Sequence, residues 1–122
     1  MPLPKILIVT NNPDVQSEHP DHVMFVNGGV FEVFCAVRDM IHLGSRLITH
    51  PMSGSIKPNV TPYKSVIVTK DKAPMNYQSL QIIEDAIVTF NKMIKPNYTY
   101  NEATLDDFRV IDLDIINSAM TS

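Results

Sequence analysis

The side chains best suited to chemistry lie together in the proline-rich segment from His50 to Pro62. His50 is the candidate acid or base, because an imidazole titrates near neutral pH. Ser53 and Ser55 could donate hydrogen bonds to an oxyanion or a phosphate, and Lys57 could supply a positive charge. Neither serine sits in a nucleophile elbow, and prolines rather than a helix follow them, so the segment is no phosphate-binding loop. These residues therefore favour binding of a small anion over catalysis.

The same segment has a structural explanation. Thr49 and His50 could satisfy backbone groups of a proline-rich loop, and Gly54 could be required for its backbone angles. Both explanations stay open at the level of sequence.

Four apolar segments are expected to form the sheet that carries this loop. The unbroken run Lys5–Thr10 predicts a central strand buried on both faces, and His22–Val26 and Arg46–Thr49 predict two more strands. A helix from Val30 to Leu43 lies between the latter two, which is the order of a βαβ unit with parallel strands. Tyr63–Thr69 is expected to return antiparallel, because no helix connects it to the strand before it.

The remaining ranges predict connections and two further helices. Residues 14–21 are polar and should form a surface connection, whereas Tyr77–Ile94 has the apolar period of a second long helix. Residues 97–104 resemble a loop, Phe108–Ile111 a short strand or extended segment, and Asp112 the cap of a last helix through Met120. We therefore expect one α/β domain over residues 1–122, with a mixed, mostly parallel sheet of about four strands, two long helices and a short C-terminal helix.

Three chain segments should meet at the edge where the parallel strands end, which is where α/β proteins bind ligands. They are Asn11 with Asn12, the turn Asn27–Gly29 before the first long helix, and the His50–Pro62 loop. Amide hydrogens at the start of a helix attract anions. The returning strand would bring Tyr63 and Lys64 to the same edge.

Composition limits the classes of function. The chain has 122 residues, 44% of them hydrophobic, and a formal charge of −3, yet residues 51–75 carry four lysines and one acid. A local cationic segment on an acidic protein suits a small anion, since nucleic-acid binding needs a broader basic face. A single cysteine, Cys35, excludes a disulfide framework and a structural zinc finger, and we expect no metal and no cofactor. We find no leader or membrane-spanning pattern, so we expect a cytoplasmic protein that does not bind membranes.

One helical stripe carries Cys35, Arg38, Asp39 and His42. Cys35 and His42 would lie about 10 Å apart along the helix axis, which is too far for direct proton transfer. Cys35 is expected to be a small buried hydrophobe, and Arg38 and Asp39 to tie the helix to its neighbours. A role in a homodimer interface is the alternative.

Several segments of the chain form a pattern, with the core THPMSGSIKPN as its most specific part. They are Ile8–Pro13, Val37–Gly44, Leu47–Asn59, Thr61–Ser65, and Ser79–Leu80 with Ile82–Glu84. In these segments the chain resembles the GrdX family, small proteins encoded beside the glycine, sarcosine and betaine reductases of amino-acid-fermenting anaerobes. Val60 departs from the acidic residue expected at that position.

The resemblance implies a setting rather than an activity. That setting is reductive (Stickland) amino-acid fermentation, with a small carboxylate or phosphate as ligand and glycine or betaine reductase components as partners. The loop motif and the sheet edge together give the expected ligand contacts, which are Asn11, Asn12, Gly28, Gly29, Thr49, His50, Ser53, Gly54, Ser55, Lys57, Asn59, Tyr63 and Lys64. The leading expectation is an accessory protein that binds a small anion or a reductase component through residues 49–64. The alternatives are a small enzyme acting on a phosphorylated or acylated metabolite with His50 as acid or base, and an assembly factor without a small ligand.

Overall fold

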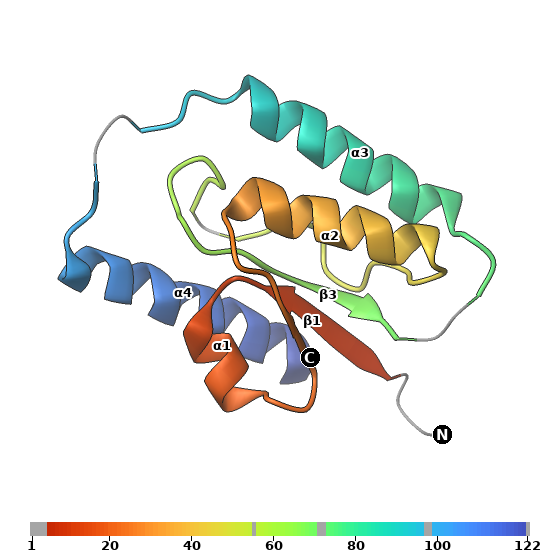
Figure 1. Cartoon of the computed structure of the whole chain (residues 1–122), viewed down its shortest axis with the longest axis horizontal. Coiled ribbons are helices and arrows are strands. Elements are labelled where there is room, and N and C mark those ends of the chain that lie inside the picture. Colours follow the sequence, from red (N-terminus) through yellow and green to blue (C-terminus); the bar gives the residue numbers. More distant parts are fainter. Residues whose placement is uncertain (1–4, 55, 71–72, 97–98, 122) are drawn as a thin grey trace.

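The computed structural model describes residues 5–54, 56–70, 73–96 and 99–121. In chain order its elements are β1 (Ile6–Thr10), α1 (Pro13–Glu18), β2 (Val23–Phe25), α2 (Val30–His42), β3 (Ser65–Thr69), α3 (Tyr77–Lys92) and α4 (Glu102–Thr121) (Figure 1). The sheet order is β2-β1-β3, with β2 parallel and β3 antiparallel to β1. The predicted central position of the first strand is confirmed.

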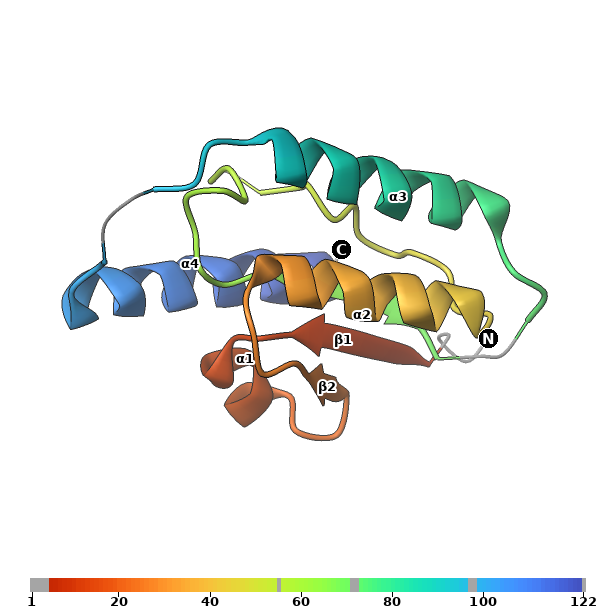
Figure 2. The same cartoon turned by 45° about the horizontal axis from the view of Figure 1, so that its top comes forward.

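Helices cover both faces of the sheet. Alternate strand residues point to opposite faces, and apolar residues on each face pack against helices. Val9, Val66 and Val68 pack against α2 and α3, where the rings of Phe34 and Phe90 meet edge to face at 5.8 Å. On the other face, residues of β1 and β3 form a smaller apolar cluster with residues of α1 and α4, namely Ile8, Ile67, Val15 and Ile116. Figure 2 shows α2 above β1 and β2, with α3 running alongside α2.

The expected sheet of about four mostly parallel strands is corrected to three strands of mixed direction in the described part of the chain. The range Arg46–Thr49 forms only an isolated antiparallel bridge, from Leu47 to Val68. Thr49 interrupts the ladder there, because its Oγ1 accepts the N–H of Ile67 at 2.9 Å. The direction of this segment relative to β3 is nevertheless the one predicted.

Two other predictions are wrong. Residues 14–18 of the expected surface connection belong to the short helix α1, which Pro13 opens and which Asn12 caps by accepting the N–H of Asp14 at 3.0 Å. The C-terminal region is one continuous helix, α4, where we expected a loop, an extended segment and a shorter helix. Asn101 caps its start by accepting the N–H of Thr104 at 2.8 Å, so Asp112 lies inside the helix instead of capping one. The bounds of α2 and α3 agree with the predicted ranges to within two residues.

The stripe on α2 ties this helix to α3. Arg38 Nη1 lies 3.5 Å from Glu84 Oε1 on α3, as expected of a residue that links neighbouring helices. Cys35 is half-buried, and its burial raises the pKa of the thiol. Within the described residues, no helix is long and apolar enough to cross a membrane, and no cluster of histidine, cysteine and acidic side chains could hold a metal ion.

Candidate functional site

A chain of buried hydrogen bonds lies where β1 ends and β3 begins, under α4. Asp112 of α4 is only 7% exposed, and its Oδ2 accepts from Ser65 Oγ at 2.7 Å and from Asn12 Nδ2 at 3.0 Å. Because the Ser65 hydroxyl donates its hydrogen bond to the carboxylate, the Thr10 hydroxyl must be the donor in the 2.6 Å contact between Thr10 Oγ1 and Ser65 Oγ. Burial raises the pKa of Asp112, and the hydrogen bonds from Ser65 and Asn12 oppose that shift.

Lys64 is the second charged group buried at this edge, with an exposed fraction of 6%. Its Nζ donates to the backbone oxygen of Ser53 at 2.5 Å. No acidic oxygen of the described residues lies within ion-pair distance of this ammonium, although Asp112 is near enough to oppose the lowering of its pKa by burial. Lys64 and Asp112 both line a small space of about 20 Å³, which we call the inner hollow; its walls also include Ser53, Gly54, Ile56, Thr61, Tyr63, Phe108, Ile111 and Ile115.

The side chain of Asn11 brings together the three segments that we expected at one edge. Its Nδ2 donates to the backbone oxygens of Gly28 and Pro62, both at 2.9 Å, and its Oδ1 accepts the N–H of Lys64 at 2.8 Å. The end of β1, the turn before α2 and the end of the proline-rich loop therefore meet. All of these contacts of Asn11 are internal.

The start of α2 has a carboxylate from its own chain. Glu32 folds back so that its Oε2 accepts the N–H of Gly29 at 3.2 Å, which is half of a capping box. A side chain at Gly28 would meet Glu32 Cβ at 2.9 Å, so glycine leaves room for this contact. The carboxylate of Glu32 therefore lies at the N-terminus of α2, and Gly28 leaves the space that its side chain occupies.

The first half of the loop uses its polar groups to hold its own backbone. His50 is exposed, and its Nδ1 accepts the N–H of Met52 at 3.0 Å. Ser53 Oγ donates to the backbone oxygen of His50 at 2.8 Å, and Thr49 bonds to β3. Gly54 has a φ of +129°, which favours glycine. Ser55 lies outside the described residues.

The second half of the loop is held by α4 and the segment before it. Tyr100 donates its hydroxyl to the backbone oxygen of Val60 at 2.7 Å. Arg109 Nη1 donates to the hydroxyl oxygen of Tyr63 at 2.8 Å, while Nη2 pairs with Glu102 at 3.0 Å. The hydrogen bond with Tyr63 is the main cause that raises the pKa of Arg109. Tyr63 therefore anchors the loop.

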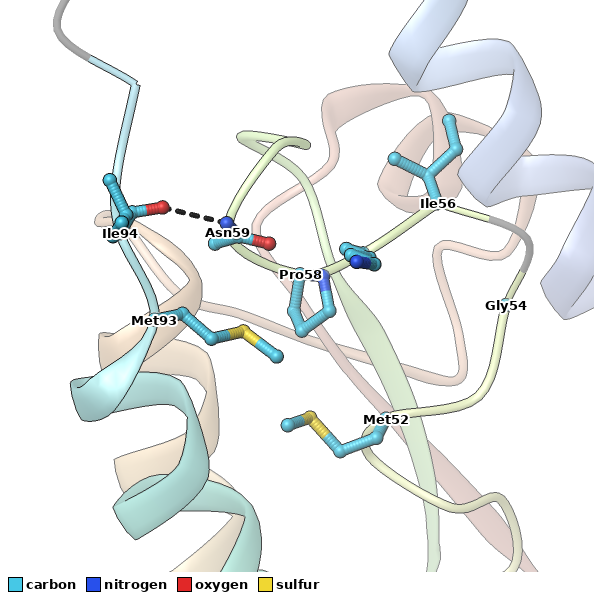
Figure 3. A pocket seen from close by; sticks show the side chains of 8 residues that line it. Met52, Gly54, Ile56, Pro58, Asn59, Met93 and Ile94 are labelled. Carbon is cyan, nitrogen blue, oxygen red and sulfur yellow. Dashed lines mark hydrogen bonds between the residues drawn. The ribbon is translucent and has the colours of Figure 1, made fainter.

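A larger hollow opens between the loop and the end of α3, and Figure 3 shows it from close by. Its volume is about 450 Å³, which is in the size range of small-molecule sites. We call it the outer hollow. Its walls are mostly apolar and come from Met52, Gly54, Ile56, Pro58, Met93 and Ile94, with Lys57 and Asn59 as the polar members. The side chains of Met52, Pro58 and Met93 project into the space between the two segments (Figure 3).

Lys57 is the charged residue among the described residues that line the outer hollow. Lys57 is exposed, and the backbone oxygens at the end of α3, which would repel an anion, already accept from other groups. Lys95 Nζ donates to the oxygens of Phe90 and Met93, and Asn59 Nδ2 donates to that of Ile94 at 2.6 Å. Asn59 Oδ1 is buried and has no hydrogen-bond partner among the described residues.

A third hollow, of about 390 Å³, lies at the opposite end of the sheet, lined by Arg46, Ile48, Thr69 and Gln78 among others. It contains none of the predicted site residues.

The predicted site is thus divided between two places. Gly54 lines both hollows, Lys57 and Asn59 line the outer one, and Ser53, Tyr63 and Lys64 the inner one. His50 and Thr49 line neither hollow in the described part of the chain. Sequence reasoning missed Asp112, Arg109, Ser65, Met93 and Ile94. Asp112, Arg109, Met93 and Ile94 lie far along the chain from the loop that they contact, and Ser65, just after the loop, gave no signal because its partner Asp112 is distant in the chain.

Comparison with known proteins assigns the family. A family model described as "GrdX-like protein" matches residues 7–121. No match was found among curated proteins or among solved structures. Because the matched range covers nearly the whole chain, the chain belongs to the GrdX-like protein family.

Proposed function

We propose that this GrdX-like protein binds a small carboxylate with a short apolar chain in the outer hollow. The observation that carries the proposal is the combination of apolar walls with one exposed cation, Lys57, in a space of about 450 Å³. Met52, Met93 and Pro58 would cover the apolar chain, since thioether side chains adapt to irregular shapes. Lys57 would pair with the carboxylate at the open rim.

This chemistry favours a carboxylate over a bare phosphate. An inorganic phosphate has no apolar part and would leave the methionine walls in contact with water, so it gains only the charge attraction. A short fatty acid gains both. Because Lys57 is exposed, its share of the affinity is modest and falls as salt is added.

The metabolic setting is a further part of the proposal and rests on family membership. It is reductive fermentation of glycine, sarcosine or betaine, with a reductase component as the protein partner. The exposed Ile94, 87% accessible at the rim of the outer hollow, is where such a partner would touch the ligand site. Catalysis by His50 gains no support, since its Nδ1 is used inside the loop.

Calorimetric titration at low salt tests the proposal with butyrate, acetate and inorganic phosphate as probes. We expect butyrate to bind most tightly. Lys57→Gln should weaken butyrate about fivefold, which corresponds to about 1 kcal/mol for an exposed ion pair. Lys70→Gln is the matched control, because Lys70 is also exposed but follows β3 at the other end of the sheet. Equal weak binding of all three anions, or equal affinity in the two variants, would refute the proposal.

A further inference from the structure

The third hollow, of about 390 Å³, is used neither by the proposed function nor by the buried network under α4. It lies where α2 and β3 end and α3 begins, three points that are close together at one end of the molecule (Figure 1). Its volume is in the size range of small-molecule sites. Among the described residues that line it, Arg46 is the charged one and none is acidic. The lining therefore favours a negatively charged ligand.

The backbone at Arg46 is held in place by two neighbouring elements. The N–H of Arg46 donates to Thr69 Oγ1 at 2.9 Å, and the backbone oxygen of Arg46 accepts the N–H of Thr69 at 2.8 Å. The next residue, Leu47, donates its N–H to Ser79 Oγ at 3.0 Å. These bonds join the segment after α2 to the end of β3 and to the first turn of α3. The walls are thus formed before a ligand binds, which lowers the entropy that binding must remove.

The polar side chains of the lining are oriented to donate. Ser79 is 5% exposed, and because its oxygen accepts from Leu47, the hydroxyl proton is what it can offer to a ligand. Asn76 Oδ1 accepts the N–H of Ser79 at 2.7 Å, so the Nδ2 of Asn76 is the group that remains to donate. The guanidinium of Arg46 presents a planar fork of N–H groups that matches the oxygens of an anion. Donors from two elements therefore surround one space.

This arrangement suits a phosphate group better than a carboxylate. A phosphate has three terminal oxygens and can accept from donors on several sides, whereas a carboxylate has two oxygens in one plane. The hollow also has room beyond the phosphate. Ile48 and Ile82 can cover the carbon atoms of an attached organic part, and the amide of Gln78 can bond to its hydroxyls. The lining therefore favours an ester of a small polar molecule over free phosphate.

We propose that the third hollow binds a phosphate monoester of a small polyhydroxy molecule. Arg46 and the hydroxyl of Ser79 donate to the phosphate oxygens, and Gln78 bonds to the organic part. The site shares no lining residue with the outer hollow and does not depend on Lys57. The two proposals can therefore fail separately.

Calorimetric titration of the intact chain at low salt tests this site with glycerol 3-phosphate, inorganic phosphate and acetate. We expect glycerol 3-phosphate to bind most tightly, and Arg46→Gln to weaken it about fivefold, as for the loss of one exposed charge. Lys92→Gln is the matched control, because Lys92 is also exposed but lies at the other end of α3. The absence of saturable binding, or equal affinities of the two variants, would overturn the proposal. Equal affinity for glycerol 3-phosphate and inorganic phosphate would overturn the choice of an ester.

A second pair of variants tests the location. Gln78→Glu adds a negative charge to the wall of the third hollow, and Gln16→Glu adds the same charge on α1, beyond the opposite end of β1. Both side chains are exposed, so neither change should disturb the fold. Gln78→Glu should weaken glycerol 3-phosphate at least about fivefold, and Gln16→Glu should leave its affinity close to that of the wild type. Equal weakening by both would mean that net charge controls binding, which contradicts a site in this hollow.

Discussion

Replacing Asp112 by alanine should destabilise the fold by about 2–4 kcal/mol. Asp112 is the acceptor at the end of the chain of donors that runs from the N–H of Asn12 through Thr10 and Ser65. Without it the buried Ser65 hydroxyl loses its acceptor, and the Lys64 ammonium loses the nearby negative charge. Asn12 Nδ2 keeps one partner, the backbone oxygen of Arg109 at 2.9 Å, which limits the cost.

Urea unfolding followed by circular dichroism measures this change. For a chain of this size, 1 kcal/mol corresponds to about 4 °C in Tm, so a fall of about 8–16 °C is expected in a thermal melt. Asp114→Ala is the matched control, because Asp114 lies on the same helix and carries the same charge but is exposed. A loss for Asp112→Ala no greater than that for Asp114→Ala would show that the buried network does not hold α4 to the sheet.

Three further predictions follow from single contacts. The stability of the wild type relative to Asp112→Asn should rise as the pH falls from 7 towards 4. Burial raises the pKa of Asp112 in the folded chain above its value in the unfolded chain, so the folded chain takes up the proton first. Urea midpoints measured across this pH range check the prediction, and a constant difference between the two proteins would contradict it. Gly44→Ala should lower the free energy of unfolding by about 2–4 kcal/mol in the same assay, and Gly29→Ala should lower it clearly less. Gly44 has a φ of +112°, and a Cβ added there would lie 2.3 Å from the backbone oxygen of Ala73. Equal losses in the two variants would refute this explanation. The Cys35 thiol should react with a disulfide reagent more slowly in the folded than in the unfolded chain at pH 8, because burial raises its pKa, and a faster reaction in the folded chain would count against it.

The regular elements that sequence predicts well are those whose burial follows a simple period. β1 is an apolar run, and α2 and α3 repeat apolar residues at helical spacing, so their positions follow from the hydrophobic pattern. α4 is different because a charged residue, Asp112, occupies a buried position of its apolar stripe. Apolar spacing alone therefore predicts a helix that begins at Asp112, whereas α4 runs without a break through this residue.

The candidate site was predictable only in part for a similar reason. Asn11 and the loop residues Lys57 and Asn59 follow from the ends of strands and from the motif. Asp112 and Met93 are brought to these places by tertiary packing, and no local signal marks a carboxylate that bonds to a serine distant in the chain. The isolated bridge at Leu47 likewise depends on a side chain. The N–H of Ile67 donates to Thr49 Oγ1, whereas in a regular ladder it would donate to a backbone oxygen of the neighbouring strand.

Labelling the methionine methyl groups with carbon-13 and titrating with butyrate tests the ligand site most directly. Met52 and Met93 line the outer hollow, whereas Met24 lies on β2 and Met120 lies on α4, packed against the smaller apolar cluster. We expect the methyl signals of Met52 and Met93 to shift together along one saturation curve while Met24 and Met120 stay in place, and Lys57→Gln to move that curve to higher butyrate concentration. Saturable shifts at Met24 or Met120 without shifts at Met52 and Met93, or no saturable shift at any methionine, would contradict the proposed function.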